Sequence, residues 1–221
     1  MQLGENQNRV HIIGSPELDI MLSKNLPQLT EVRRRYEITF SRYGIAIFHP
    51  VTTELRQSRA NVRNFIAAIK KSDKKFIVIL PNNDQGSRDI LEELGSLEGH
   101  ENFKILPSMR FEYFLTLMKN AELIVGNSSA GVRQATVYGV PAVNIGTRQF
   151  RRAQAPTIIN CDYSPENIVK AIKRTKNIKR VSTSQFGTGN SALAFKNIIQ
   201  DPNFWQVGVQ KTFADLVTPI K

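Results

Sequence analysis

The sequence has 221 residues, 41% of them hydrophobic, which is enough for one large domain with a substantial core. The formal net charge is +11, but the basic residues are scattered and no RNA-binding motif or zinc-finger spacing accompanies them. We therefore expect neither a nucleic acid nor a membrane as partner. With no long apolar segment, no signal peptide and the single cysteine Cys161, the composition predicts a cytoplasmic protein without a disulfide or a cysteine metal cluster.

Strand and helix patterns alternate along most of the chain. Short apolar runs predict six strands, at residues 44–48, 76–80, 103–106, 123–125, 142–145 and 157–159. Amphipathic or capped stretches predict helices at residues 58–71, 87–97, 111–119, 132–138 and 168–174, the last opened by Ser164-Pro165-Glu166. Strands that alternate with helices of this length predict an α/β fold, a doubly wound, parallel, six-stranded Rossmann-like sheet.

The densest group of motifs lies between residues 123 and 152. The apolar strand stops at Gly126, and Asn127, Ser128 and Ser129 can each cap the helix that follows. Gly131 would let a ligand approach the backbone. A strand, a small polar turn and a helix N-terminus together make an anion site, for which phosphate is the usual occupant. A plain helix cap without a ligand is the alternative.

The predicted topology brings these motifs together. In a sheet with strand order 3-2-1-4-5-6, ligands bind beyond the carboxyl ends of strands 1 and 4. His49 follows the first predicted strand, Asn82 the second and Asn127 the fourth, so all should face one crevice. The alternatives are a structural role for His49, bonded to a backbone carbonyl, and a helix cap for Asn82.

Several segments resemble one enzyme family. GNSSAGVR at residues 126–133, followed by GVPAVNIGTRQ at 139–149, is similar to the hydrolysing UDP-N-acetylglucosamine 2-epimerases, whose fold resembles that of two-domain GT-B glycosyltransferases. FHPVTTE at 48–54, LPNNDQGSR at 80–88 and FGTGNSA at 186–192 also look like that family, in the expected order. The resemblance extends from about Arg9 to the C-terminal region.

The resemblance implies a role for each candidate residue. It places His49, the catalytic candidate, near the phosphates or the leaving group, and backbone groups at Met109 around the uracil. Arg148, otherwise a surface charge, would contact the nucleotide. The implied UDP-binding residues are Asn82, Met109, Ser128, Ser129, Gly131, Gln134 and Arg148. No cofactor or metal ion is expected.

Two features depart from the family pattern. Gln134 stands where the family usually has a glutamate for the ribose hydroxyls, which should weaken binding about tenfold without abolishing it. The family also has an N-terminal domain with acidic catalytic residues. We expect residues 1–19 to be the end of that domain and the crossover, with a strand at 10–13. Residues 20–200 would be the UDP-binding domain and 201–221 a tail whose Phe204, Trp205 and Phe213 pack across the apolar face left by the missing domain.

In the family, UDP leaves C1 as a proton leaves C2, and water adds to the resulting 2-acetamidoglucal to give N-acetylmannosamine, a reaction of the sialic acid pathway. We expect this chain to supply the UDP-binding half and to be inactive by itself. Its expected partners are UDP, UDP-N-acetylglucosamine and either further copies of the chain or a separate N-terminal half. The alternatives are a related glycosyltransferase domain and a non-catalytic nucleotide-sugar binding module. The sequence does not decide whether the base of the ligand is uracil or guanine, or which amino sugar it carries.

Overall fold

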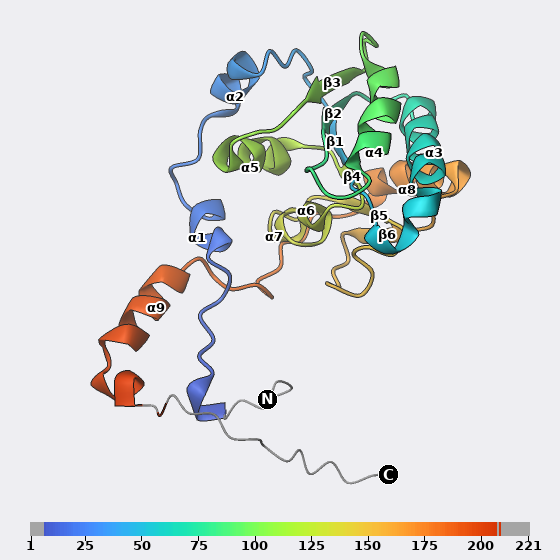
Figure 1. Ribbon diagram of the computed structural model, residues 1–221. Helices are drawn as coiled ribbons and strands as arrows, with labels where there is room; N and C mark the ends of the chain where they lie inside the picture. The colour runs from blue at the N-terminus through green and yellow to red at the C-terminus, as the bar shows by residue number, and fades with distance from the viewer. Residues whose placement is uncertain (1–6, 207, 209–221) are drawn as a thin grey trace, which may run out of the picture. The chain divides into compact units, whose positions relative to one another are not determined.

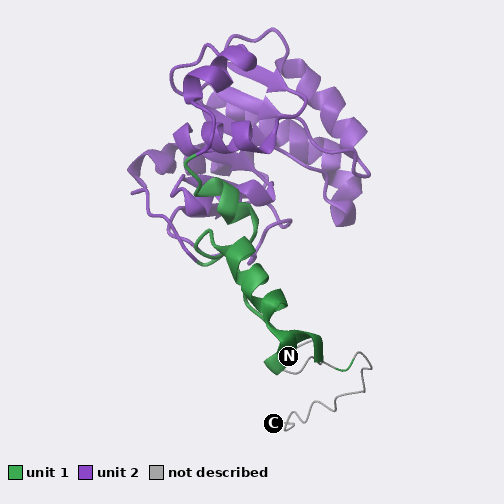
Figure 2. Cartoon of the chain, turned by 90° about the vertical axis from the view of Figure 1, so that its left-hand side faces the viewer, with its two compact units in different colours: residues 1–24, 185–221 green, residues 25–184 purple. Residues whose placement is uncertain are grey.

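The computed structural model describes residues 7–206 and 208 (Figure 1). The chain divides into two compact units, one of residues 1–24 and 185–221 and one of residues 25–184, which Figure 2 colours separately. We call them unit 1 and unit 2. This division groups both ends of the chain, whereas the boundaries expected at residues 19–20 and 200–201 refer to the family's domains and stay predictions.

Unit 2 is built on a six-stranded sheet. Its strands are β1 Gly44–Ile47, β2 Phe76–Ile79, β3 Phe103–Leu106, β4 Ile124–Gly126, β5 Ala142–Ile145 and β6 Ile158–Cys161. Every pair is parallel and the order is β3-β2-β1-β4-β5-β6, which confirms the predicted doubly wound sheet. β1, β4 and β5 are buried at every position, as expected for apolar runs in a sheet covered on both faces.

Helices cover both faces of the sheet (Figure 1). Along β1, Ala46 packs into one apolar cluster, while Ile45 and Ile47 pack into the other, because successive side chains of a strand point to opposite faces. α3 Ser58–Lys71, α4 Ser87–Leu94 and α8 Pro165–Arg174 complete the first cluster, and α2 Leu29–Arg35, α5 Phe111–Asn120, α6 Ser129–Val132 and α7 Gln134–Val137 the second. The 3-10 turns of this unit are η2 Thr52–Gln57, η3 Gly95–Leu97 and η4 Thr175–Asn177.

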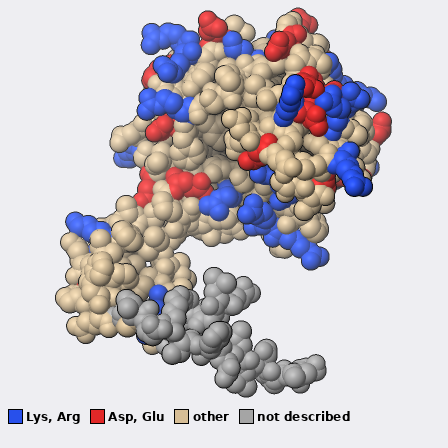
Figure 3. All heavy atoms as spheres, viewed as in Figure 1, with Lys and Arg blue, Asp and Glu red and all other residues tan. Residues whose placement is uncertain are grey.

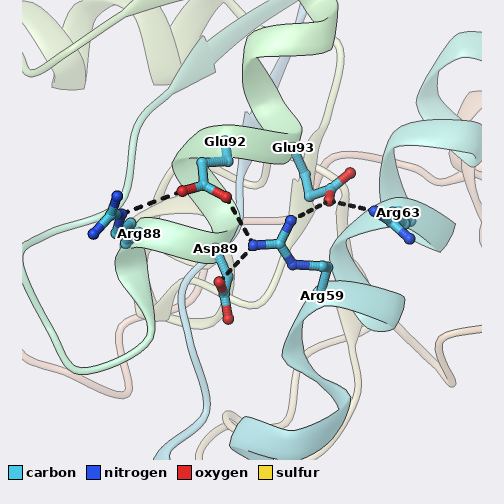
Figure 4. A network of polar contacts seen from close by, with 6 residues as sticks. All are labelled: Arg59, Arg63, Arg88, Asp89, Glu92 and Glu93. Atoms are coloured by element: carbon cyan, nitrogen blue, oxygen red, sulfur yellow. Dashed lines mark hydrogen bonds and ion pairs between the residues drawn. The ribbon is translucent and has the colours of Figure 1, made fainter.

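An ion-pair network joins α3 to α4 (Figure 4). The guanidinium of Arg59 on α3 donates to three carboxylates of α4, on Asp89 at 2.7 Å, Glu92 at 2.7 Å and Glu93 at 3.1 Å. These side chains are partly exposed, and exposed pairs add little to the free energy of unfolding. The network therefore serves mainly to fix how α4 lies along α3.

Unit 1 contains η1 Gln7–Arg9, α1 Glu17–Met21, α9 Ser191–Gln200 and η5 Pro202–Gln206. The carboxylate of Asp19 on α1 accepts from the backbone amides of Ser191 at 2.9 Å and Ala192 at 2.8 Å. These are the first amides of α9, which have no partner within their own helix. Asp19 therefore caps α9 and joins segments far apart in the sequence.

Several predicted elements differ from the observed ones. The predicted helix at 132–138 is replaced by two short helices, α6 and α7, which meet at Arg133, where φ of −108° and ψ of −79° depart from ideal helical values. The helix at 87–97 ends at Leu94 and continues as η3. Residues 10–13 form no strand, because no described segment pairs with them. Phe204 and Trp205 pack against each other, and Phe213 lies outside the described residues.

Figure 3 shows Lys and Arg spread over the visible face of unit 2 and interspersed with Asp and Glu, as the scattered sequence positions suggest. On this face, opposite charges that alternate in this way do not form the continuous basic stripe of a nucleic-acid surface. The absence of a nucleic-acid partner stays a prediction. Among the described helices, none is both long and apolar enough to cross a membrane.

Candidate functional site

The site begins where β1 and β4 end side by side. Gly126, the last residue of β4, has φ +135°, and a Cβ atom there would lie 1.8 Å from the carbonyl oxygen of Ile47. Only glycine fits this approach. The next amide, of Asn127, donates to the same oxygen at 3.2 Å. The chain therefore turns away from the sheet while it stays against the end of β1.

Asn127 then connects the loops that follow three strands. Its Oδ1 accepts from the amide of His49 at 2.7 Å, and its Nδ2 donates to the carbonyl of His49 at 2.8 Å. Nη1 of Arg148, after β5, donates to the carbonyl of Asn127 at 3.1 Å. The side chain of Asn127 is thus a clamp between loops and not the helix cap that the sequence suggested, since Ser128 caps α6 by accepting from Ala130 N.

His49 is buried, with 8% of its surface exposed. Burial lowers the pKa of its imidazole to about 4, the charge of Arg148 acts in the same direction, and Asp84 opposes both. The ring is therefore neutral at pH 7. Its Nδ1 has no hydrogen-bond partner among the described residues, so the carbonyl bond considered as a structural alternative for the ring is not formed by this atom.

Arg148 is half-buried, and burial lowers the pKa of its guanidinium. An arginine remains charged at neutral pH in proteins. A fixed cation beside a neutral imidazole can bind an anion without binding a proton first. The two side chains therefore suit a phosphate group better than a proton transfer.

These side chains face a cavity of about 350 Å³ at the carboxyl edge of the sheet. Its lining combines polar and apolar residues, so the cavity suits a ligand that is partly anionic and partly apolar. The polar group comprises His49, Asn82, Ser128, Ser129, Gln134 and Arg148. The apolar group comprises Ile47, Ile79, Leu80, Met109, Phe111, Phe114 and Ala130.

No lining residue in the described part of the chain is Asp or Glu. General acid–base catalysis needs a group whose pKa lies near the working pH, and His49, with a pKa of about 4, is a weak base. The described residues also contain no group of three or more His, Cys, Asp or Glu that could hold a metal ion. The cavity is therefore equipped to bind and to stabilise negative charge.

Known proteins resemble this chain in sequence. Residues 1–200 match the family model described as UDP-N-acetylglucosamine 2-epimerase. The chain belongs to this family. A UDP-N-acetylglucosamine 2-epimerase of Neisseria meningitidis serogroup B is 42% identical over 220 residues, which cover 98% of this chain and 58% of the relative. The polysialic acid biosynthesis protein P7 of Escherichia coli is 30% identical over 187 residues, which cover 84% of this chain and 48% of the relative.

A solved structure has the same fold. The UDP-GlcNAc 2-epimerase of Methanocaldococcus jannaschii in complex with UDP-GlcNAc and UDP superposes with a TM-score of 0.72 at 21% identity, over 90% of this chain and 56% of that one. The chain thus spans about half the length of the proteins it matches, 58% and 48% for the two curated relatives. The fold of the epimerase family is therefore shared over the part that this chain represents.

Seven of the eight epimerase site residues expected from the sequence line the cavity: His49, Asn82, Met109, Ser128, Ser129, Gln134 and Arg148. Gly131 is the exception. A Cβ atom on it would lie 3.7 Å from Ile124 Cγ2 and 3.8 Å from Ala142 Cβ, and its amide donates to Ser128 O at 3.1 Å. Both distances are ordinary van der Waals contacts, so the packing of α6 on the sheet does not require a glycine here. Contact of Gly131 with a ligand stays a prediction.

Two expected details differ. α6 has four residues, too few for a large helix dipole, so an anion would be attracted mainly by Arg148 and the serine hydroxyls. Asn82 does not cap α4, whose N-cap is Gly86; its carbonyl instead accepts from the hydroxyl of Ser87. This leaves the side chain of Asn82 at the cavity.

Sequence patterns did not point to the aromatic side chains that line the cavity. Phe111 and Phe114 lie one turn apart on α5 and both line it. Their spacing is that of residues on one helix face, but the same pattern is typical of core packing. Only the tertiary structure shows that this face is open to a ligand.

Proposed function

We propose that the chain is the nucleotide-binding part of a hydrolysing UDP-N-acetylglucosamine 2-epimerase, which converts UDP-N-acetylglucosamine to N-acetylmannosamine and UDP. The observation that carries the proposal is the mixed lining of the cavity, in which Arg148 and two serines come from the loops after β5 and β4, and Met109, Phe111 and Phe114 come from the segment after β3. A nucleoside diphosphate likewise combines an anionic part with an apolar part.

Each group of lining residues would have its own task in the reaction. UDP leaves C1 with its diphosphate negatively charged, and fixed donors that face this charge lower the barrier. Arg148, Ser128 and Ser129 would supply those donors. The neutral ring of His49 would donate a hydrogen bond to a phosphate oxygen and would not remove the C2 proton. The base of the nucleotide would lie against Met109, Phe111 and Phe114.

The acid and base of the reaction would come from outside this cavity. Removal of the C2 proton requires a carboxylate or another base of suitable pKa. Since no Asp or Glu among the described residues lines the cavity, we propose that the chain by itself does not turn over UDP-N-acetylglucosamine. The same observation favours a second function, a nucleotide-sugar binding module without catalysis.

Calorimetric titration with UDP tests the binding function. We expect weak binding that is lost in the double variant Ser128→Ala/Ser129→Ala. The variant Ser96→Ala, at an exposed position outside the cavity, is the matched control and should bind UDP as the unchanged chain does. A folded sample that gives neither heat nor a thermal shift at saturating UDP would contradict the proposal.

A turnover assay separates catalysis from binding. The purified chain is incubated with UDP-N-acetylglucosamine, and released UDP and N-acetylmannosamine are followed over time. We expect no turnover. Product formation at about 1 per second or faster, an ordinary enzymatic rate, would show that the chain carries its own acid–base pair.

A further inference from the structure

Glu54 lies in η2, between β1 and α3, and both of its carboxylate oxygens bind hydroxyl groups from other loops. Oε1 accepts from the hydroxyl of Thr147 at 2.5 Å and Oε2 from that of Tyr163 at 2.8 Å. Thr147 follows β5 and Tyr163 follows β6. One carboxylate therefore links the loops that follow three strands of the sheet.

The ring of Tyr163 has a fixed place in this arrangement. It lies against Gly146, where a Cβ atom would be 2.2 Å from its Cζ, and edge-on to Phe48, with ring centroids 6.3 Å apart. Burial, together with the bond to Glu54, raises the pKa of Tyr163, so its hydroxyl remains a donor at neutral pH. Glu54 thus binds a tyrosine whose ring is packed between other residues, as well as the loop that contains Thr147.

The loop held in this way carries Arg148. Thr147 precedes it directly, and the guanidinium of Arg148 reaches the carbonyl of Asn127 at 3.1 Å and lines the cavity. Glu54 itself is not among the residues that line the cavity. Its two oxygens are both occupied, so it is badly placed to act as the missing acid or base.

We propose that Glu54 is a positioning residue, which holds the loop from Gly146 to Gln149 so that Arg148 presents its guanidinium to the cavity. This inference rests on the proposed function for the ligand concerned, a nucleoside diphosphate. The holding of the loop does not depend on the ligand. The two parts can therefore be measured separately.

Amide hydrogen exchange without ligand tests the holding of the loop. The amide of Gly146 donates to Cys161 O at 2.9 Å and that of Phe150 to Thr147 O at 3.0 Å, so both report on opening of this segment. In Glu54→Ala we expect both to exchange about tenfold faster, because two hydrogen bonds that oppose opening are lost. Glu98→Ala, which removes an exposed glutamate outside the cavity, should leave both rates unchanged.

A double-mutant cycle with UDP tests the action through Arg148. We expect Glu54→Ala to weaken UDP binding about tenfold in the unchanged chain and to have no further effect in Arg148→Ala. Glu54→Gln keeps one acceptor oxygen and should bind UDP with intermediate affinity. A general structural role would weaken binding equally in both backgrounds, and that result would overturn the proposal.

The two measurements distinguish the two proposals. If the unchanged chain binds no UDP but Glu54→Ala accelerates exchange at Gly146 and Phe150, the proposed function is wrong and the role of Glu54 in holding the loop stands. If exchange in Glu54→Ala equals that of the unchanged chain, the proposal for Glu54 is overturned, whether or not UDP binds.

Discussion

The side chain of Asn127 pairs with the backbone of His49 much as a neighbouring strand would. Its Oδ1 accepts from the amide at 2.7 Å and its Nδ2 donates to the carbonyl at 2.8 Å. β4 ends at Gly126, so the side chain continues the hydrogen-bonding pattern between β1 and β4 by one step. The clamp fixes His49 relative to Ser128 without a longer strand, which leaves both loops open to the cavity.

The first prediction is that Asn127→Asp strongly destabilises the chain. The change removes the donor to His49 O and places a carboxylate at a position with 0% exposure. We expect the free energy of unfolding to fall by about 2–4 kcal/mol in urea denaturation. Asn120→Asp is the control, because Nδ2 of Asn120 also donates to a backbone carbonyl, Thr116 O at 2.8 Å, but at an exposed position. Similar losses in the two variants would show that the clamp has no special role.

The second prediction concerns Gly126. In Gly126→Ala the new Cβ would lie 1.8 Å from Ile47 O, and φ of +135° disfavours any other residue. We expect a loss of about 4 kcal/mol or more, or no folded chain, by thermal unfolding followed with circular dichroism. Gly95→Ala is the matched control, since φ there is −53° and no heavy atom lies within 4 Å. It should be neutral or stabilising by up to about 1 kcal/mol. Comparable losses in both variants would contradict the prediction.

The sheet could be predicted from the sequence because its strands are short apolar runs with clear ends. The boundaries of β3, β5 and α3 are as predicted, and the strand order is confirmed. The order also sufficed to bring seven of the eight candidate residues to one cavity, since parallel strands end at the same edge. Their binding roles stay predictions.

The features that the sequence did not predict depend mainly on contacts between residues far apart in the chain. Asn127 and His49 are 78 positions apart, so their pairing is invisible to local patterns, and an Asn before two serines is typical of a helix cap. The link from Glu54 to Tyr163 spans 109 positions. α1 has five residues and α2 seven, too short for a helical period to be recognised.

The third prediction is that His49 stays neutral across the physiological range. Its pKa of about 4 lies below the ordinary value of 6.5. Between these two pH values the histidine is protonated in the unfolded chain and neutral in the folded chain. The contribution of the neutral ring to the free energy of unfolding is therefore fully present above pH 6.5. It is lost as the pH falls towards 4, which lowers the free energy of unfolding by at most about 3 kcal/mol. A proton NMR titration of the 3 histidines, assigned with His49→Asn and His100→Asn, should show no midpoint for His49 above pH 5. A midpoint near 6.5 would mean that the ring is solvated.

The fourth prediction is that Gln134→Glu tightens UDP binding. Gln134 lies at the start of α7, is 8% exposed and lines the cavity. If its side chain faces the ribose, a carboxylate would accept stronger, charge-assisted bonds from the hydroxyls, and affinity for UDP should rise about tenfold. Inorganic diphosphate, which has no ribose, should bind as before.

Separate calorimetric titrations with UDP and with diphosphate measure how the affinity for each ligand changes in the variant. Gln57→Glu adds the same charge at an exposed position outside the cavity and should change neither affinity. Weaker binding of diphosphate to Gln134→Glu would place the side chain beside the phosphates, because like charges repel there. No change for either ligand would place it away from the nucleotide, and the departure from the family's glutamate would then have no effect on UDP affinity.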